Sequence, residues 1–231
     1  MQASYIGAYW GDRRETAFEC GERLSRCLLG LGAVDPLLAA WFLKGSRRST
    51  ATVPIALGAD DLARLFDRGR NRRDSDGEVI EELGFRVGLW NNRRPALGLS
   101  AHCGSYANQS GLLNSFVLSV PAPDSGAEVL YQVDPASAIF EIIVESWEPH
   151  WATWSTHEWR EAQSPARREP VIGWKTYLAN WGIESLSFGV GKPLADGVLI
   201  ESASQFSEVD GSFVVSARRK LNHMSLLHPI P

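Results

Sequence analysis

The chain has 231 residues and a formal net charge of −4, with 44% hydrophobic and 22% charged residues. This balance is typical of a water-soluble globular protein and excludes a disordered or fibrous one. A mildly acidic chain repels nucleic acid and anionic lipid and attracts basic partners, so the charge favours protein binding.

The N-terminal segment predicts a strand followed by a helix. Aromatic and small apolar residues fill 4–10, which is typical of a strand, and the run stops at a Gly-Asp turn. Asp12 is a credible N-cap with Glu15 three residues later, and apolar residues then recur at helical spacing as far as Gly32. We therefore expect an amphipathic helix that begins after Asp12.

The next segment contains a short turn, a strand, a helix and a loop. Pro36 fits the first position of a helical turn, and the apolar run 40–43 predicts a buried strand that ends at Gly45. A helix is expected to open at Asp60 or the residue after it. Residues 68–76 are almost all Arg, Asn and Asp, so they predict a solvated loop.

Three strand-like runs and the clearest helix follow. The runs cover 84–90, 96–102 and 113–120, and an antiparallel meander is their simplest arrangement. A helix then begins at Asp134 and ends before Pro149, with an apolar stripe on one side and glutamates outside it.

The last third of the chain repeats this alternation in weaker form. Extended segments are expected over 150–154, 173–178, 197–201 and 212–215, and helices over 155–162 and 217–227. Helices interleaved with antiparallel strands, without a repeating strand-helix-strand unit, predict an α+β fold with packed helices. We predict a single domain over 1–231, with two loosely similar halves, about 1–125 and 126–231, as an open alternative.

No segment approaches the roughly 20 apolar residues that a membrane helix needs, and the first residues lack the layout of a signal peptide. Cys20, Cys27 and Cys103 are an odd number of thiols, which does not suggest a secreted disulfide framework. We expect a cytoplasmic protein with reduced cysteines.

Residues that could carry chemistry are few. The five histidines form no zinc motif, and the glycine-bearing run 189–192 is expected to be a turn because it completes no phosphate-binding loop. No metal or cofactor is expected. His102 and Cys103 are the right types for a base and a nucleophile, but adjacent strand residues point to opposite faces. A small α+β enzyme with a cleft built on this pair, or on Glu145 and Glu148, remains the alternative.

Charged residues indicate a surface for a basic protein. The arginines of 68–73 could attract phosphate, but carboxylates follow them directly, which favours a solvated loop over a nucleic-acid site. Opposed potentials speed association with a basic partner. The partner-binding candidates are Asp74, Asp76, Glu78, Glu81, Glu82, Glu141, Glu145 and Glu148. One or two exposed residues among the nine tryptophans would also mark a binding face.

Five segments, in this order along the chain, resemble the immunity protein 52 family. They are 5–15 (YIGAYWGDRRE), 31–45 (ending in DPLLAAWFLKG), 83–91 (LGFRVGLWN), 147–154 (WEPHWATW) and 173–178 (GWKTYL). The resemblance implies an α+β antitoxin of a bacterial polymorphic or type VI secretion system, encoded beside its toxin. It also implies a toxin that is often a nuclease with a restriction-endonuclease-like domain, and it supplies no catalytic residue.

A nuclease is electropositive around its substrate channel, so an acidic protein can occlude that channel. The sequence therefore predicts a non-enzymatic immunity protein that binds and neutralises a cognate toxin. Neither nucleic acid nor a membrane is expected as a partner, and the oligomeric state is left open.

Overall fold

The structure is a computed structural model. It describes residues 2–43, 53–107, 113–166, 168–180, 190–223 and 227–230. The chain divides into two compact units, one made of residues 9–118 and the other of residues 1–8 and 119–231. In both units antiparallel strands carry packed helices, which confirms the predicted α+β class.

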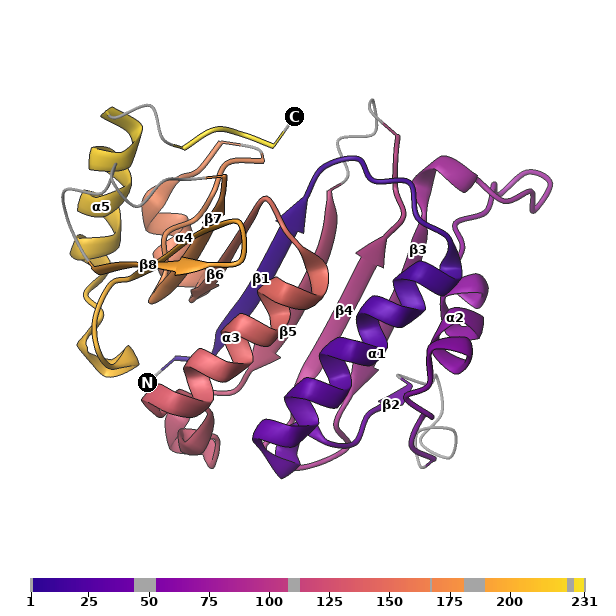
Figure 1. Cartoon of the computed structure of the whole chain (residues 1–231), viewed down its shortest axis with the longest axis horizontal. Helices are drawn as coiled ribbons and strands as arrows, with labels where there is room; N and C mark the ends of the chain where they lie inside the picture. Colours follow the sequence, from indigo (N-terminus) through magenta and orange to yellow (C-terminus); the bar gives the residue numbers. More distant parts are fainter. Residues whose placement is uncertain are drawn as a thin grey trace. The chain divides into compact units, whose positions relative to one another are not determined.

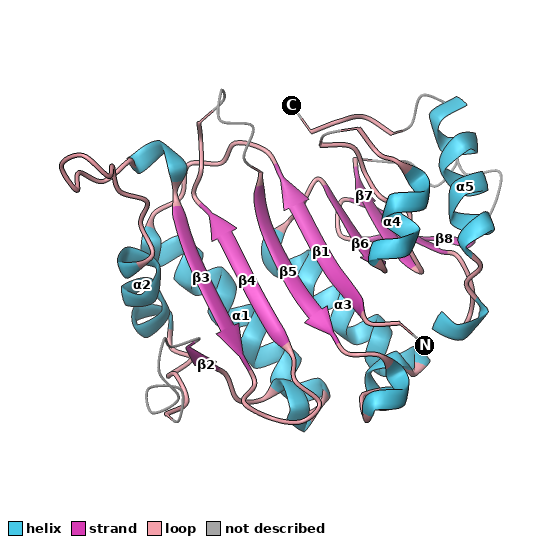
Figure 2. Ribbon diagram, turned by 180° about the vertical axis from the view of Figure 1, so that it is seen from behind, coloured by secondary structure: helices cyan, strands magenta, loops and turns pink. Residues whose placement is uncertain are grey.

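The unit of residues 9–118 contains a meander. Its strands lie in the order β2 (Phe42–Leu43), β3 (Phe85–Trp90), β4 (Gly98–Cys103) and β5 (Asn114–Val120), the last of which continues beyond residue 118. The helices α1 (Ala17–Val34) and α2 (Ala59–Arg68) lie on one face of β3 and β4 (Figure 1). From behind, no described helix stands in front of these strands (Figure 2).

The start of α1 differs from the prediction. The N-cap is Thr16, whose hydroxyl accepts from the Glu19 N–H at 3.2 Å, while the Glu19 carboxylate accepts from the Thr16 N–H at 2.7 Å. Asp12 therefore lies outside the helix. Glu15 precedes the N-cap and is therefore not the capping glutamate, and its carboxylate is paired with Arg13 and Arg23, at 3.1 and 2.7 Å.

The expected strand 40–43 is shorter than predicted. Within the described part of this segment, Phe42 and Leu43 alone pair, opposite Trp90 and Leu89 of β3, while residues 44 and 45 lie outside the described residues. The helical turn at Pro36 is present over Pro36–Leu38, because the Asp35 carboxylate accepts from the Leu37 N–H at 2.7 Å.

The other unit contains strands whose order departs from their order in the chain. The order is β1 (Ser4–Trp10, of which residues 4–8 belong here), β6 (Trp151–Ser155), β7 (Lys175–Ala179), β9 (Gly197–Glu201) and β8 (Val190–Leu194). The helices are α3 (Val133–Trp147), α4 (His157–Gln163) and α5 (Gly211–His223). In Figures 1 and 2, α3 covers one face of the strands, and α4 with α5 covers the other.

Two predicted segments of this unit are wrong. Residues 190–192 are not a turn but the start of β8, paired with β9, while Gly189 lies outside the described residues. Residues 212–215 are not a strand but the first turns of α5, which is described as far as His223; residues 224–226 lie outside the described residues, and residue 227 is not helical. The Asp210 carboxylate accepts from the Ser212 N–H at 2.8 Å, and this N-terminal contact outweighs the β-propensity of the run.

Among the described residues, no helix is both long enough and apolar enough to cross a membrane.

Candidate functional site

An ordered acidic hairpin projects from the unit of residues 9–118. We define the acidic hairpin as residues 70–83. It is held by backbone hydrogen bonds from Arg73 to Glu78 at 2.8 Å and from Ile80 to Asn71 at 2.9 Å. Its five candidate carboxylates, Asp74, Asp76, Glu78, Glu81 and Glu82, are all exposed.

The base of the acidic hairpin is anchored to the loop after β4. The Glu82 carbonyl accepts from the Tyr106 N–H at 3.0 Å and from the Ser105 hydroxyl at 3.1 Å. The backbone of the hairpin therefore has fixed partners at its base while its carboxylates stay in solvent.

The arginines of the run 68–73 have partners within the described chain. Arg70 pairs with Asp67 at 2.8 Å, Arg73 with Glu78 at 3.3 Å, and Arg72 donates to the Gly77 carbonyl at 3.0 Å. Six carboxylates and four arginines lie between residues 67 and 82, so the segment is acidic on balance. The guanidinium groups of Arg68 and Arg70 are therefore engaged by α2, and those of Arg72 and Arg73 by the loop itself.

The candidate glutamates of α3, Glu141 and Glu145, and Glu148 at its C-cap are exposed but differ in surroundings. Glu141 lies close enough to Lys192 to raise the pKa of that ammonium, whose main partner is Glu201 at 2.7 Å. Glu148 follows the last helical residue in a left-handed conformation, with φ of 46°. Glu145 lies one helical turn beyond Glu141, on the exposed side of the helix.

Beneath α3 lies a buried ion pair that the sequence did not reveal. The Lys175 ammonium is 1% exposed, forms a short ion pair with Glu201 and donates to the Ser137 hydroxyl at 3.1 Å. Burial alone would raise the pKa of the Glu201 carboxyl, but Lys175 and Lys192 together lower it below its ordinary value. This cluster connects α3 to β7, β8 and β9, and each of its charged groups has a partner of opposite charge.

His102 and Cys103 do not form a catalytic pair. His102 lies opposite the exposed Arg86 in β3, whereas Cys103 lies opposite the buried Phe85, so the two side chains are on different faces. The His102 ring nitrogens lie 2.8 and 3.1 Å from the carbonyl oxygens of Leu83 and Leu113.

The titration of these two groups also argues against an activated thiol. Burial lowers the pKa of His102, so its imidazole is neutral at neutral pH. Burial and the neighbouring Cys20 raise the pKa of the Cys103 thiol, which keeps it protonated. A nucleophilic cysteine needs the opposite shift.

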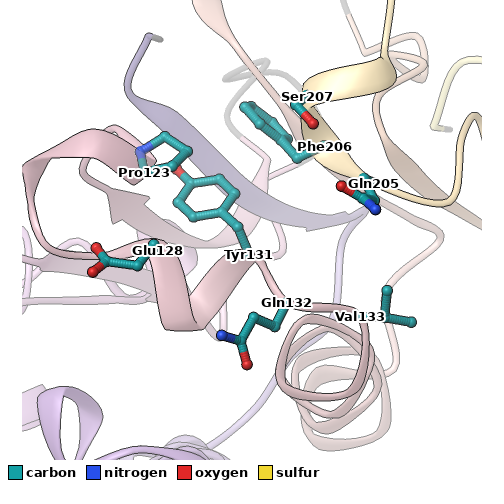
Figure 3. Close-up of a pocket in the computed structure, with 8 residues that line it drawn as sticks. All are labelled: Pro123, Glu128, Tyr131, Gln132, Val133, Gln205, Phe206 and Ser207. Carbon is teal, nitrogen blue, oxygen red and sulfur yellow. The ribbon is translucent and has the colours of Figure 1, made fainter.

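A hollow of about 440 Å³ opens in the unit of residues 1–8 and 119–231. Its walls come from two segments, 123–133 and 205–207, which Figure 3 shows facing each other. The rings of Tyr131 and Phe206 lie against each other with centroids 4.8 Å apart, and both are more than nine-tenths buried. No sequence motif marks this hollow, because its two walls are more than 70 residues apart in the chain.

Other candidate sites gain no support within the described residues. No three His, Cys, Asp or Glu side chains gather there to hold a metal ion. Of the tryptophans in this part of the chain, only Trp90 and Trp159 are partly exposed, and the others are buried. Trp181 lies outside the described residues.

The fold and these surfaces define a class of protein: an α+β protein whose candidate functional groups are exposed carboxylates and a shallow aromatic hollow. A family model described as Immunity protein 52 matches residues 2–207. The chain therefore belongs to the Immunity protein 52 family.

Comparison with solved structures gives the same architecture. The type VI secretion system protein PA0821 of Pseudomonas aeruginosa is similar, with a TM-score of 0.58 and 11% sequence identity. The match covers 98% of this chain and 76% of that one, and it shows a shared fold. A search among curated proteins gives no significant match.

Proposed function

We propose that this chain protects a bacterial cell by binding and neutralising a cognate toxin of a type VI secretion system, without catalysing a reaction. The observation that carries the proposal is the family match over residues 2–207. The finer proposal is that the toxin is a nuclease with a restriction-endonuclease-like domain and that neutralisation takes place in the cytoplasm.

The eight exposed carboxylates are the proposed toxin contacts. A nuclease must be electropositive where it holds its substrate, and an acidic surface of its inhibitor meets that potential. The acidic hairpin supports this role best, because its backbone is hydrogen-bonded while Asp74 and Glu81 make no ion pair in the described chain. Glu141, Glu145 and Glu148 form the second proposed contact set.

The alternative of an enzyme is less well supported. His102 is turned away from Cys103, and the Cys103 thiol is held protonated by burial. Glu145 and Glu148 are both exposed.

Co-expression with the product of the adjacent toxin gene tests the function. We expect the full chain to restore growth and to bind the purified toxin with a dissociation constant of about 1 nM or less, near −12 kcal/mol. We also expect it to block nucleic-acid cleavage by that toxin. A toxin that is neutralised but cleaves no nucleic acid would overturn the nuclease proposal alone, and failure of both rescue and binding would overturn the function.

Charge reversal tests the proposed contacts. The variant Asp74→Lys/Asp76→Lys and the variant Glu145→Lys each change one contact set, and Glu22→Lys on the exposed side of α1 is a matched control. Loss of more than about 2 kcal/mol of binding marks the centre of an interface. Binding equal to that of the control would remove the affected set from the interface.

A further inference from the structure

We infer that the hollow between residues 123–133 and 205–207 receives a basic side chain, Arg or Lys, of the protein partner. The inference rests on the proposed function for the identity of that partner, and it adds a contact that lies outside the eight candidate carboxylates. The hollow has a volume of about 440 Å³. That volume is within the range of about 300–1,000 Å³ in which proteins hold small ligands or a long side chain.

The charged side chains of the two segments around the hollow are all acidic, and one of them, Asp124, is already partnered by the N-terminal ammonium group. Segments 123–134 and 205–210 contain five carboxylates and neither Lys nor Arg. Glu128 lines the hollow. Asp134 lies in the first turn of α3, directly after the lining residue Val133. The Glu208 carboxylate accepts from the Gln205 N–H at 3.0 Å, and the Asp210 carboxylate caps α5. A cation is the ligand that such a surface favours.

The floor of the hollow suits the stem and head of a basic side chain. Tyr131 and Phe206 supply aromatic rings, and Val133 is half exposed at the edge. In Figure 3 the Tyr131 ring lies among the labelled side chains, with Pro123 and Phe206 above it, Gln132 and Val133 below it and Gln205 to its right. Aromatic faces attract Arg and Lys, and the methylene stem of either residue packs on apolar surface.

The rings cannot move aside easily, so the floor is preformed. The Phe206 ring also packs against the Trp174 and Trp159 rings, with centroid separations of 5.6 and 5.2 Å. The Tyr131 hydroxyl donates to the Pro121 carbonyl at 2.7 Å. A preformed pocket with an acidic rim is the kind of site that fixes one anchor residue of a partner.

A charge series at one position of the rim tests the inference with the full chain. Gln132 is exposed, lines the hollow and makes no capping hydrogen bond for α3. We expect Gln132→Lys to weaken binding of the adjacent-gene toxin by about tenfold and Gln132→Glu to preserve or tighten it. Val53→Lys, at a position that is 72% exposed in the other unit, adds the same charge as a control. Equal affinities for Gln132→Lys and Val53→Lys would overturn the inference and leave the proposed function standing.

A second measurement does not need the toxin. N-acetyl-arginine amide and N-acetyl-lysine amide are titrated into the full chain while backbone amide signals are followed by NMR. We expect shifts confined to residues 128–133 and 205–207, with dissociation constants on the order of millimolar, and weaker shifts in Gln132→Lys. N-acetyl-norleucine amide, which has a similar stem and no charge, is the control.

Equal shifts with the norleucine compound, or none with the two cations, would show that the hollow does not select a basic side chain. If the wild-type chain failed to bind the toxin while the arginine compound still shifted these residues, the proposed function would fall and the cation site would stand.

Discussion

A directional chain of hydrogen bonds links four residues beneath the aromatic hollow. The Trp154 indole donates to the Ser4 hydroxyl at 2.9 Å, and the Tyr131 hydroxyl donates to the Pro121 carbonyl at 2.7 Å. The remaining contact, 2.7 Å between the hydroxyls of Ser4 and Tyr131, is therefore donated by Ser4. Loss of the Tyr131 proton would remove the donor to the Pro121 carbonyl, whereas Ser4 would still donate to the phenolate oxygen.

This chain predicts a loss of stability at high pH. Burial raises the pKa of Tyr131 from 10.0 to about 12, so the folded state holds the phenolic proton more tightly than the unfolded state. The resulting stabilisation is complete below pH 10 and is lost as the pH rises through about 12. Two pKa units correspond to about 3 kcal/mol of unfolding free energy.

Urea unfolding at pH 9 and at pH 11 checks this expectation. Tyr131→Phe should lose less unfolding free energy between these two values than the wild type, although it is less stable at pH 9. Burial and Asp196 also raise the pKa of Tyr177. This residue remains in the variant, so the unfolding free energy of the variant still falls somewhat with rising pH. Equal slopes for the wild type and Tyr131→Phe would contradict the assignment.

At the scale of elements, two glycines of the acidic hairpin and its base make different demands. Gly84 has φ of 63° and ψ of −145°, and a Cβ there would lie 2.3 Å from the Cys103 carbonyl oxygen. Gly77, at the tip, also has positive φ, 74°, but a Cβ there would meet nothing within 4 Å. Gly84 is needed both for its positive φ and because no Cβ fits there, whereas Gly77 is needed only for its positive φ.

We expect Gly84→Ala to lower the unfolding free energy by about 3 kcal/mol or more, and Gly77→Ala by about 1 kcal/mol. Urea unfolding gives the unfolding free energy of both variants. The difference between the two losses measures the cost of placing a Cβ where the start of β3 approaches the loop after β4. The account of the hairpin base is wrong if the two substitutions have the same effect.

The elements that the sequence predicted well are those in which one pattern dominates. The alternation of β3 and the apolar stripe of α3 are present as expected, because each buries one face. The errors lie at positions where a single side-chain contact decides where a helix begins. Thr16 rather than Asp12 starts α1, and Asp210 turns a β-prone run into the start of α5.

The candidate site was only partly accessible to sequence reasoning. The exposure of the eight carboxylates followed from their polar surroundings and is present in the structure. The ion pair of Lys175 and Glu201 depends on the register of β7 with β9, which the sequence does not specify. The aromatic hollow joins segments that are distant in the chain, and its one sequence signal was the lack of basic residues in both of them.

At the scale of the whole molecule, the first residues of the chain belong to the unit formed by its second half. Residues 1–8 group with residues 119–231. Ser4 accepts from Trp154, the Tyr5 ring lies 5.2 Å from that of His157, and Ile6 is fully buried. A short N-terminal segment therefore completes a core whose other members lie more than 110 residues later.

Deletion of residues 2–8 should consequently loosen a region that is remote in the sequence. We expect faster amide hydrogen exchange in Trp151–Ser155 and around Tyr131, because the Trp154 indole loses its acceptor and the space of Ile6 is left empty. Deletion of residues 2 and 3 alone removes only exposed side chains and should leave exchange there almost unchanged. Exchange in Phe85–Trp90, within the unit of residues 9–118, provides the internal reference for both variants. Unaltered protection of Trp151–Ser155 after the longer deletion would mean that the second half of the chain forms this core without the first strand.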